Sequence, residues 1–228
     1  MKIFDCTTFF NENLMLEVRF NILNKYVDKF VIAEAKYSHS GETKKLNFNI
    51  KKFSEFKSKI IYLVIENEPE NLNYQKNNNT IYEKDVDMRP NSIKRISLQR
   101  NKLLDVLNEA DNEDYIFYSD NDEIPNLEGV DFEINQNKIL IFKQKLFYYK
   151  FNLFCDRVDW YGTKGCQKKD LISFSWLREV KPKKYPFFRF DTFFSKTKYK
   201  NIKIIEDGGW HFSQLKTPKD IEMKLLNQ

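Results

Sequence analysis

Apolar and polar positions alternate along the first half of the chain in blocks that predict strands and helices in turn. Short runs rich in β-branched and aromatic residues predict buried strands at 2–6, 30–33, 60–65 and 115–120. Between them, apolar residues spaced three and four apart predict helices at 12–26, 49–56 and 92–110. This alternation indicates parallel βαβ units through the first 125 residues.

The pattern changes beyond residue 125. Runs with aromatic faces predict strands at 138–142, 146–154, 171–177 and 202–205, and a helix is expected over 217–226. The polar, Asn-rich segment 66–91 is predicted to be one long loop, and loops of this length are usually functional or disordered. We therefore expect a single α/β domain over 1–228, doubly wound in its N-terminal half and mixed in its C-terminal half.

Composition narrows the class of protein. The chain has 228 residues, 41% hydrophobic and 31% charged, which fits one soluble, well-cored domain. Its net charge of +5 suits an anionic ligand or a membrane surface but is too small to indicate nucleic acid. The three cysteines lack a CxxC spacing, which predicts reduced thiols. We expect a cytoplasmic protein that reaches a membrane only peripherally, because no signal peptide or spanning segment is found.

The most informative segment follows the strand predicted at 115–120. Asp120, Asp122 and Glu123 come directly after that apolar run and before Pro125. Ligands of open α/β sheets bind at the carboxyl ends of the strands. One residue separates Asp120 from Asp122, so both carboxylates can reach a single Mg²⁺ or Mn²⁺ ion, which can neutralise a diphosphate leaving group. The alternative is an ordinary acidic turn.

Further segments offer weaker signals. Gly208 and Gly209 permit close backbone approach to a ligand, and His211 beside them can complete a metal site or bind a phosphate oxygen. Arg100 can direct a guanidinium toward a phosphate. The segment 160–163 is typical of an aromatic platform for a sugar ring. For each segment a structural role is the alternative: a turn, a solvated helix face, or core packing.

In combination, these segments resemble glycosyltransferase family 17. The resemblance is carried by Phe4-Asp5, by Glu17 to Phe20, by Val31 to Glu34 with Tyr37, Gly41 and Leu46, by Gln99-Arg100-Asn101, by Ser119 to Pro125 and by Gly209 to Ser213. It implies a GT-A type nucleotide-diphospho-sugar transferase fold, with a Rossmann-like N-terminal half and a mixed sheet in the C-terminal half. It also implies inverting transfer from a UDP-sugar, with UDP-N-acetylglucosamine as the expected donor, to an oligosaccharide or glycoconjugate.

The resemblance also implies roles for individual residues. Asp120 and Asp122 would hold Mn²⁺ or Mg²⁺, with His211 joining them. The nucleotide pocket would be lined by Glu34, Arg100, Asn101, Asp120 and Trp210. Glu123 or Asp207 would act as the base, with Asp159 and Glu179 as further candidates. The half at 1–125 would bind the nucleotide sugar and the half at 126–228 the acceptor, in a chain expected to be shortened at its C-terminus. The loop 66–91 would close over the donor.

Two other classes of function stay open from the sequence. A metal-dependent phosphohydrolase would use the same acids with water as the nucleophile. A non-catalytic module that binds glycans or single-stranded nucleic acid would use the aromatic residues and the positive charge. Such a module would function without Asp120 and Asp122, whereas a transferase would not.

Overall fold

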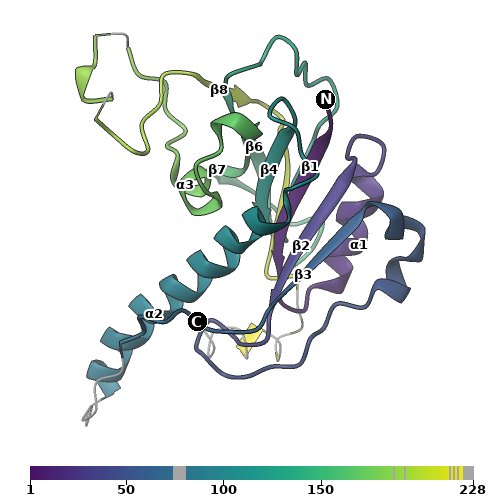
Figure 1. The fold of residues 1–228 in the computed structure, drawn as a ribbon, viewed down its shortest axis with the longest axis vertical. Helices are drawn as coiled ribbons and strands as arrows, with labels where there is room; N and C mark the ends of the chain where they lie inside the picture. The colour runs from purple at the N-terminus through teal and green to yellow at the C-terminus, as the bar shows by residue number, and fades with distance from the viewer. Residues whose placement is uncertain are drawn as a thin grey trace.

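The computed structural model is built around one mixed β-sheet with helices on both faces (Figure 1). It describes residues 1–73, 81–186, 188–192, 194–215, 217, 219, 221 and 222, and for residues 81–88 the backbone alone. Within these ranges the sheet has nine strands. In chain order they are β1 (Ile3–Phe9), β2 (Lys29–Ala35), β3 (Ile60–Ile65), β4 (Tyr115–Asp120), β5 (Glu123–Pro125), β6 (Ile139–Tyr148), β7 (Phe154–Gln167), β8 (Ile202–Ile205) and β9 (Gly209–Ser213).

The N-terminal half of the sheet is parallel. β1 pairs in parallel with β2 on one side and with β4 on the other, and β3 lies beyond β2. The chain therefore adds two strands on one side of β1 and then crosses to the opposite side. Strand order reverses between β1 and β4, and a crevice at the carboxyl ends of the strands is expected at such a reversal.

The C-terminal half of the sheet is mixed. β7 pairs antiparallel with β4 and with β6, so the two halves form one continuous sheet. β6 pairs in parallel with both β8 and β9, and β9 pairs antiparallel with the short strand β5. The mixed α/β class predicted from the sequence is confirmed.

Helices cover the two faces of the sheet in separate groups. α1 (Asn13–Leu23) and the 3₁₀ helix η1 (Ile50–Lys59) pack on one face. The C-terminal part of α2 (Ile81–Lys102), the 3₁₀ helix η2 (Leu103–Val106) and α3 (Phe174–Glu179) pack on the other. Two further 3₁₀ helices, η3 (Lys168–Asp170) and η4 (Phe190–Thr192), lie in connections.

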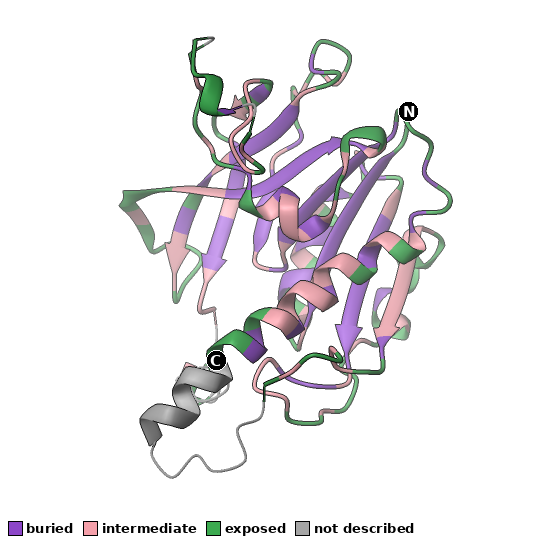
Figure 2. Cartoon of the chain, turned by 60° about the vertical axis from the view of Figure 1, so that its left-hand side comes forward, coloured by how far each residue is buried: buried purple, intermediate pink, exposed green. Residues whose placement is uncertain are grey.

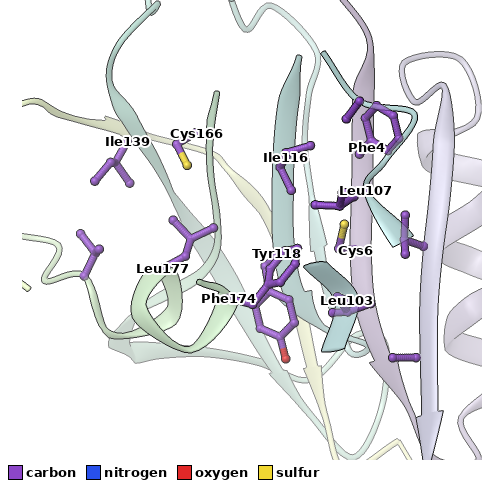
Figure 3. Close-up of a cluster of buried hydrophobic side chains, with 14 of the residues drawn as sticks. Phe4, Cys6, Leu103, Leu107, Ile116, Tyr118, Ile139, Cys166, Phe174 and Leu177 are labelled. Atoms are coloured by element: carbon purple, nitrogen blue, oxygen red, sulfur yellow. The ribbon is translucent and has the colours of Figure 1, made fainter. Parts of the chain in front are cut away.

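β1, β2 and β4 are buried along nearly their whole length, so their apolar runs are continuous rather than alternating, whereas β3 is only partly buried (Figure 2). In β2, Phe30 and Ile32 belong to the core under α1, whereas Val31 and Ala33 belong to the core under α2 and α3. Figure 3 shows the second core, where the Tyr118 ring packs against Phe174 of α3 with ring centroids 5.6 Å apart. This packing fixes α3 beside the end of β4.

Several predicted elements need correction. The strand expected at 171–177 is wrong, because α3 begins at Phe174 with the Ser173 side chain as its N-cap. The strand expected at 146–154 is interrupted: β6 ends at Tyr148 and a turn precedes β7. The loop expected over 66–91 is wrong in its last part, because α2 starts at Ile81 and includes Pro90. The helix expected over 217–226 falls largely outside the described residues.

Candidate active site

A pocket of about 410 Å³ opens at the carboxyl ends of β1 and β4, where the strand order reverses. Thr8 and Phe9 from the end of β1, Asp120 to Asp122 after β4, and Arg100 from α2 line it. His39, from the loop after β2, lies on another wall. The acidic segment predicted to follow a buried strand therefore borders a pocket, as expected for a ligand site of an α/β sheet.

The acidic segment forms a tight turn between β4, which ends at Asp120, and β5, which begins at Glu123. A fully buried arginine of α1, Arg19, holds both ends of this turn. Its guanidinium donates to the Ser119 hydroxyl at 2.5 Å and to the Glu123 carbonyl oxygen at 2.7 Å. It is neutralised by a two-point ion pair with Asp5 of β1. This fork of donors suits a buried ion pair better than a lysine would.

Asp120 lies between two arginines. Arg100 donates to its Oδ1 atom at 3.2 Å, and Arg178 of α3 donates to its Oδ2 atom at 3.1 Å. The Tyr118 hydroxyl donates to Oδ1 at 3.1 Å and accepts from Arg100. Burial works to raise the pKa of Asp120, but Arg178 and Arg100 outweigh it, so the pKa of this carboxyl is lowered. Asp120 is therefore ionised at neutral pH.

Glu123 is enclosed beneath Asp120, with only 1% of its surface exposed. Its Oε1 atom accepts from Arg178 and from the Trp160 indole, both at 2.9 Å, and its Oε2 atom accepts from the Asp120 backbone N–H. Burial raises its pKa above the ordinary value, against the opposing charge of Arg178. Both carboxyl oxygens are therefore engaged within the protein.

Asp122 is brought together with His211 by the pairing of β5 with β9. The register places Glu123 opposite His211, and the Phe212 backbone N–H donates to the Asp122 carbonyl oxygen at 2.8 Å. The His211 Nε2 atom lies 3.6 Å from Asp122 Oδ2. The Trp160 ring packs on the imidazole with centroids 4.3 Å apart. Two residues that are 89 positions apart in the sequence thus face each other.

Asp122 and His211 are residue types that can bind a divalent cation. Across the described part of the chain, no group of three or more His, Cys, Asp or Glu side chains is arranged to hold a metal ion. Among the described residues, the buried His211 Nδ1 atom has no hydrogen-bond partner. The Nε2 atom of the same ring faces Asp122. A carboxylate and an imidazole fit Mn²⁺, with ligand oxygens completing its shell. Asp120 fits less directly, because both of its oxygens already accept hydrogen bonds from arginine.

Three residues that the sequence predicted to line the nucleotide pocket make contacts that hold the fold together instead. The buried Glu34 carboxylate accepts from Lys44, from the Tyr62 hydroxyl and from the backbone N–H groups of Asn47 and Phe48. It thereby fixes the loop after β2. Asn101 accepts from the Ser175 backbone N–H and joins α2 to α3. Trp210 packs in the core under α1, since neighbouring residues of a strand point to opposite faces and His211 faces the site.

The candidate bases at the C-terminal end lie apart from this pocket. Asp207 is 80% exposed at its side chain, pairs with Lys145, and lines a separate pocket of about 270 Å³ together with Asp159. Glu179 is exposed at the end of α3. The structure therefore groups Arg100, Asp120, Asp122, Glu123 and His211, and it leaves the other predicted residues outside that group.

Sequence reasoning missed the role of Arg178 and of Arg19. Arg178 bridges Asp120 and Glu123 and also donates to the Gly162 carbonyl oxygen at 3.0 Å. Burial works to lower its pKa, but Glu123 and Asp120 outweigh this and raise it, so the guanidinium stays charged. An available signal was the spacing of Phe174, Leu177 and Arg178, which suits a short helix better than a strand.

His39 is a neutral group in the pocket. Burial lowers its pKa below the ordinary value, and the nearby positive charge of Arg100 acts in the same direction. At neutral pH the imidazole therefore carries no charge and offers one donor and one acceptor. Positive charge at this end of the sheet comes from Arg89 and Arg100, which line the pocket, and from Arg178 beside Asp120.

This arrangement defines an α/β protein with an acidic turn and two arginines at a crevice beside the carboxyl ends of parallel strands. The sequence profile of glycosyltransferase family 17 matches residues 1–181. The chain therefore belongs to glycosyltransferase family 17, and it is a glycosyltransferase. The matched region includes Arg19, Arg100, Asp120, Asp122 and Arg178, whereas β9 with His211 lies beyond it. A search of curated proteins finds no match.

Proposed function

We propose that this glycosyltransferase has a GT-A type fold and moves a sugar from a UDP-sugar to a hydroxyl of a glycan acceptor, with inversion and with Mn²⁺ or Mg²⁺. UDP-N-acetylglucosamine is the proposed donor. The observation that carries the proposal is the meeting of Asp122 and His211 at the mouth of the crevice between β1 and β4. The parallel strand order β3-β2-β1-β4 supports a nucleotide-binding half.

The two arginines supply recognition of the diphosphate. Arg100 lines the pocket, and Arg178, which bonds to the other oxygen of Asp120, adds positive charge behind that carboxylate. Guanidinium groups form paired hydrogen bonds with phosphate oxygens. Both arginines are already paired with Asp120, so the phosphate competes for donors that are held in place before the ligand arrives. Such preorganised charge stabilises the departing diphosphate.

Asp122 and His211 would hold the metal ion. The bound cation would supply further positive charge to offset the leaving group. Arg19 keeps the turn that carries Asp122 in one position, because it is bonded to both Ser119 and Glu123. Trp160 orients the imidazole of His211 through ring packing. These contacts set the geometry of the site before any ligand binds.

Inversion at the anomeric carbon requires a carboxylate that accepts the proton of the acceptor hydroxyl. Glu123 and Asp207 stay predictions for this role. Glu123 is 1% exposed and already accepts three hydrogen bonds, so an acceptor hydroxyl would reach it only after neighbouring side chains move. Asp207 would require the acceptor to reach a second pocket.

The experiment that tests the proposal is UDP release from UDP-N-acetylglucosamine with Mn²⁺ present. Asp122→Asn and His211→Gln should each lower turnover by about 100-fold, the scale for loss of one group that stabilises developing charge. Asp105→Asn is the matched control, because Asp105 is an exposed carboxylate paired with Lys102. Full turnover in Asp122→Asn, with Mn²⁺ dependence unchanged, would sink the proposal. Thermal unfolding of each variant checks that it is folded.

A further inference from the structure

A second pocket of about 780 Å³ adjoins the first. Residues 11–15, at the start of α1 and just before it, form one wall, and the turn 149–152 between β6 and β7 forms another. The linings of the two pockets have Glu12 in common. The Asn121 side chain donates to the Glu12 carbonyl oxygen at 3.2 Å, which ties this junction to the acidic turn. A ligand lying in the second pocket can therefore extend to the first.

Aromatic rings dominate the wall formed by the turn. Tyr149 is 56% exposed and Phe151 is 46% exposed, although both rings are large and apolar. The Phe151 ring is held edge-on against Phe212 of β9, with centroids 5.0 Å apart. Phe212 in turn packs on Phe147 of β6. The exposed Phe151 ring is thus backed by a layer of aromatic residues, and the Tyr149 ring packs against Tyr148 with centroids 5.9 Å apart.

The backbone at Tyr149 is strained. Its φ is +62°, a left-handed conformation that a bulky side chain adopts at a cost of about 1–3 kcal/mol. The surroundings hold it there, because the Tyr149 backbone N–H donates to the Ser213 carbonyl oxygen at 3.0 Å. Ser213 belongs to the strand that carries His211. Strain of this kind is concentrated where a side chain has to be presented in a particular direction.

The polar lining of the pocket contains three amides, and its two charged residues, Glu12 and Lys150, have opposite signs. Asn11, Asn13 and Asn152 line it, and the Asn13 Oδ1 atom is buried without a hydrogen-bond donor among the described residues. A buried acceptor of this kind is completed by a ligand hydroxyl. Aromatic faces with a few amide groups, at a volume within about 300–1,000 Å³, fit a neutral ligand that has both apolar faces and hydroxyl groups.

We propose that this pocket is the acceptor subsite and binds a short, uncharged oligosaccharide. Sugar rings stack on Tyr149 and Phe151, the amides bind their hydroxyl groups, and the terminal hydroxyl reaches the first pocket beside Glu12. The inference rests on the proposed function, since it assigns the acceptor of the same reaction. It makes the β6–β7 turn a determinant of acceptor choice.

The test uses saturation-transfer NMR on the full chain with four probes: chitotetraose, cellotetraose, mannotetraose and tetra-alanine. At least one tetrasaccharide should bind. Tyr149→Gly and Phe151→Ala should each weaken its binding about tenfold, the scale for loss of one stacked ring. Glycine at 149 adopts the left-handed conformation without strain, and thermal unfolding of each variant checks that it is folded. Phe190→Ala, at an exposed ring outside the pocket, is the matched control.

The outcomes separate this inference from the proposed function. Binding of UDP-N-acetylglucosamine is titrated on the same samples. If the donor binds while no tetrasaccharide does, or if Tyr149→Gly binds the tetrasaccharide as wild type does, the acceptor subsite is overturned and the donor site stands. Binding of tetra-alanine alone overturns it in favour of a peptide acceptor. Ring-dependent binding of a tetrasaccharide without donor binding supports the subsite and contradicts the proposed donor.

Discussion

At the scale of single residues, the site depends on paired charges that are buried or partly buried. Arg178 holds Asp120 and Glu123 together, and Arg19 holds Asp5 while bonding to the turn that follows β4. Removal of one partner of such a pair leaves an uncompensated buried charge. The arginines therefore link the stability of the fold to the geometry of the acidic turn.

Lys164 is a buried lysine that contacts the C-terminal end of α3, and its ionisation can be tested. It is 5% exposed, and its ammonium group donates to the carbonyl oxygens of Arg178 and Val180. Burial lowers its pKa from 10.5 to about 7. Between pH 7 and pH 10.5 the unfolded chain therefore binds more protons at Lys164 than the folded chain does. This lysine makes the free energy of unfolding increase as the pH rises above about 7. The slope has a ceiling of about 1.4 kcal/mol per pH unit.

The prediction is that the free energy of unfolding, measured in urea at pH 7 and pH 9, increases more in wild type than in Lys164→Met. Below pH 7 the lysine is protonated in both states, so the two proteins should show parallel pH dependence there. Lys169→Met serves as the control because Lys169 forms an exposed pair with Glu113. Equal pH dependence of wild type and Lys164→Met between pH 7 and pH 9 would contradict the assignment.

The residues of the site were only partly predictable from the sequence. Asp120 and Asp122 stand out because they follow an apolar run directly. His211 stands out because the chain has two histidines and one of them follows paired glycines. Arg178 and Arg19 do not stand out, because an arginine in a helical segment is most often exposed. Their burial depends on carboxylates that lie far away in the sequence.

At the scale of elements, the β4–β5 turn is held by α1 from below and by α3 from the side. The parallel strands β1 to β4 were predicted well, because fully buried strands produce uninterrupted apolar runs. α3 was predicted as a strand because its short apolar run has an aromatic face, although the spacing of Phe174 and Leu177 also suits one helical turn. The turn at 149–153 interrupts an aromatic run that continues across both β6 and β7, so composition alone could not locate it.

Arg19 tests the role of α1 in this arrangement. Arg19→Leu should lower the free energy of unfolding by about 3–5 kcal/mol, because Asp5 is left buried without its partner. The double variant Arg19→Leu with Asp5→Leu should recover part of that loss, since both charges are then absent. Urea unfolding measures both effects. Arg157→Leu, at an exposed arginine, is the control and should change stability by about 0.5 kcal/mol at most.

A loss below about 1 kcal/mol in Arg19→Leu would contradict the account of the turn, since this is the scale of an exposed ion pair. Recovery in the double variant distinguishes an electrostatic effect from a packing defect. If both variants are equally unstable, the arginine contributes through its packed side chain, and the turn is held by other contacts.

At the scale of the whole molecule, one sheet carries both halves of the candidate site. The parallel half supplies the crevice and the acidic turn, and the mixed half supplies Trp160 from β7 and His211 from β9. The register of β5 against β9 places His211 opposite Glu123. That register arises from pairing between distant strands, so the sequence indicated the two motifs without indicating that they meet. No helix in the described ranges has the length and apolar character needed to cross a membrane.

The most direct test of the central claim is calorimetric binding of UDP-, GDP- and dTDP-sugars to the full chain, with and without Mn²⁺. The account predicts that one UDP-sugar, expected to be UDP-N-acetylglucosamine, binds only when Mn²⁺ is present, and that Asp122→Asn abolishes this metal dependence. Nucleotide-sugar binding of equal strength with and without Mn²⁺, or no binding of any UDP-sugar when Mn²⁺ is present, would contradict it.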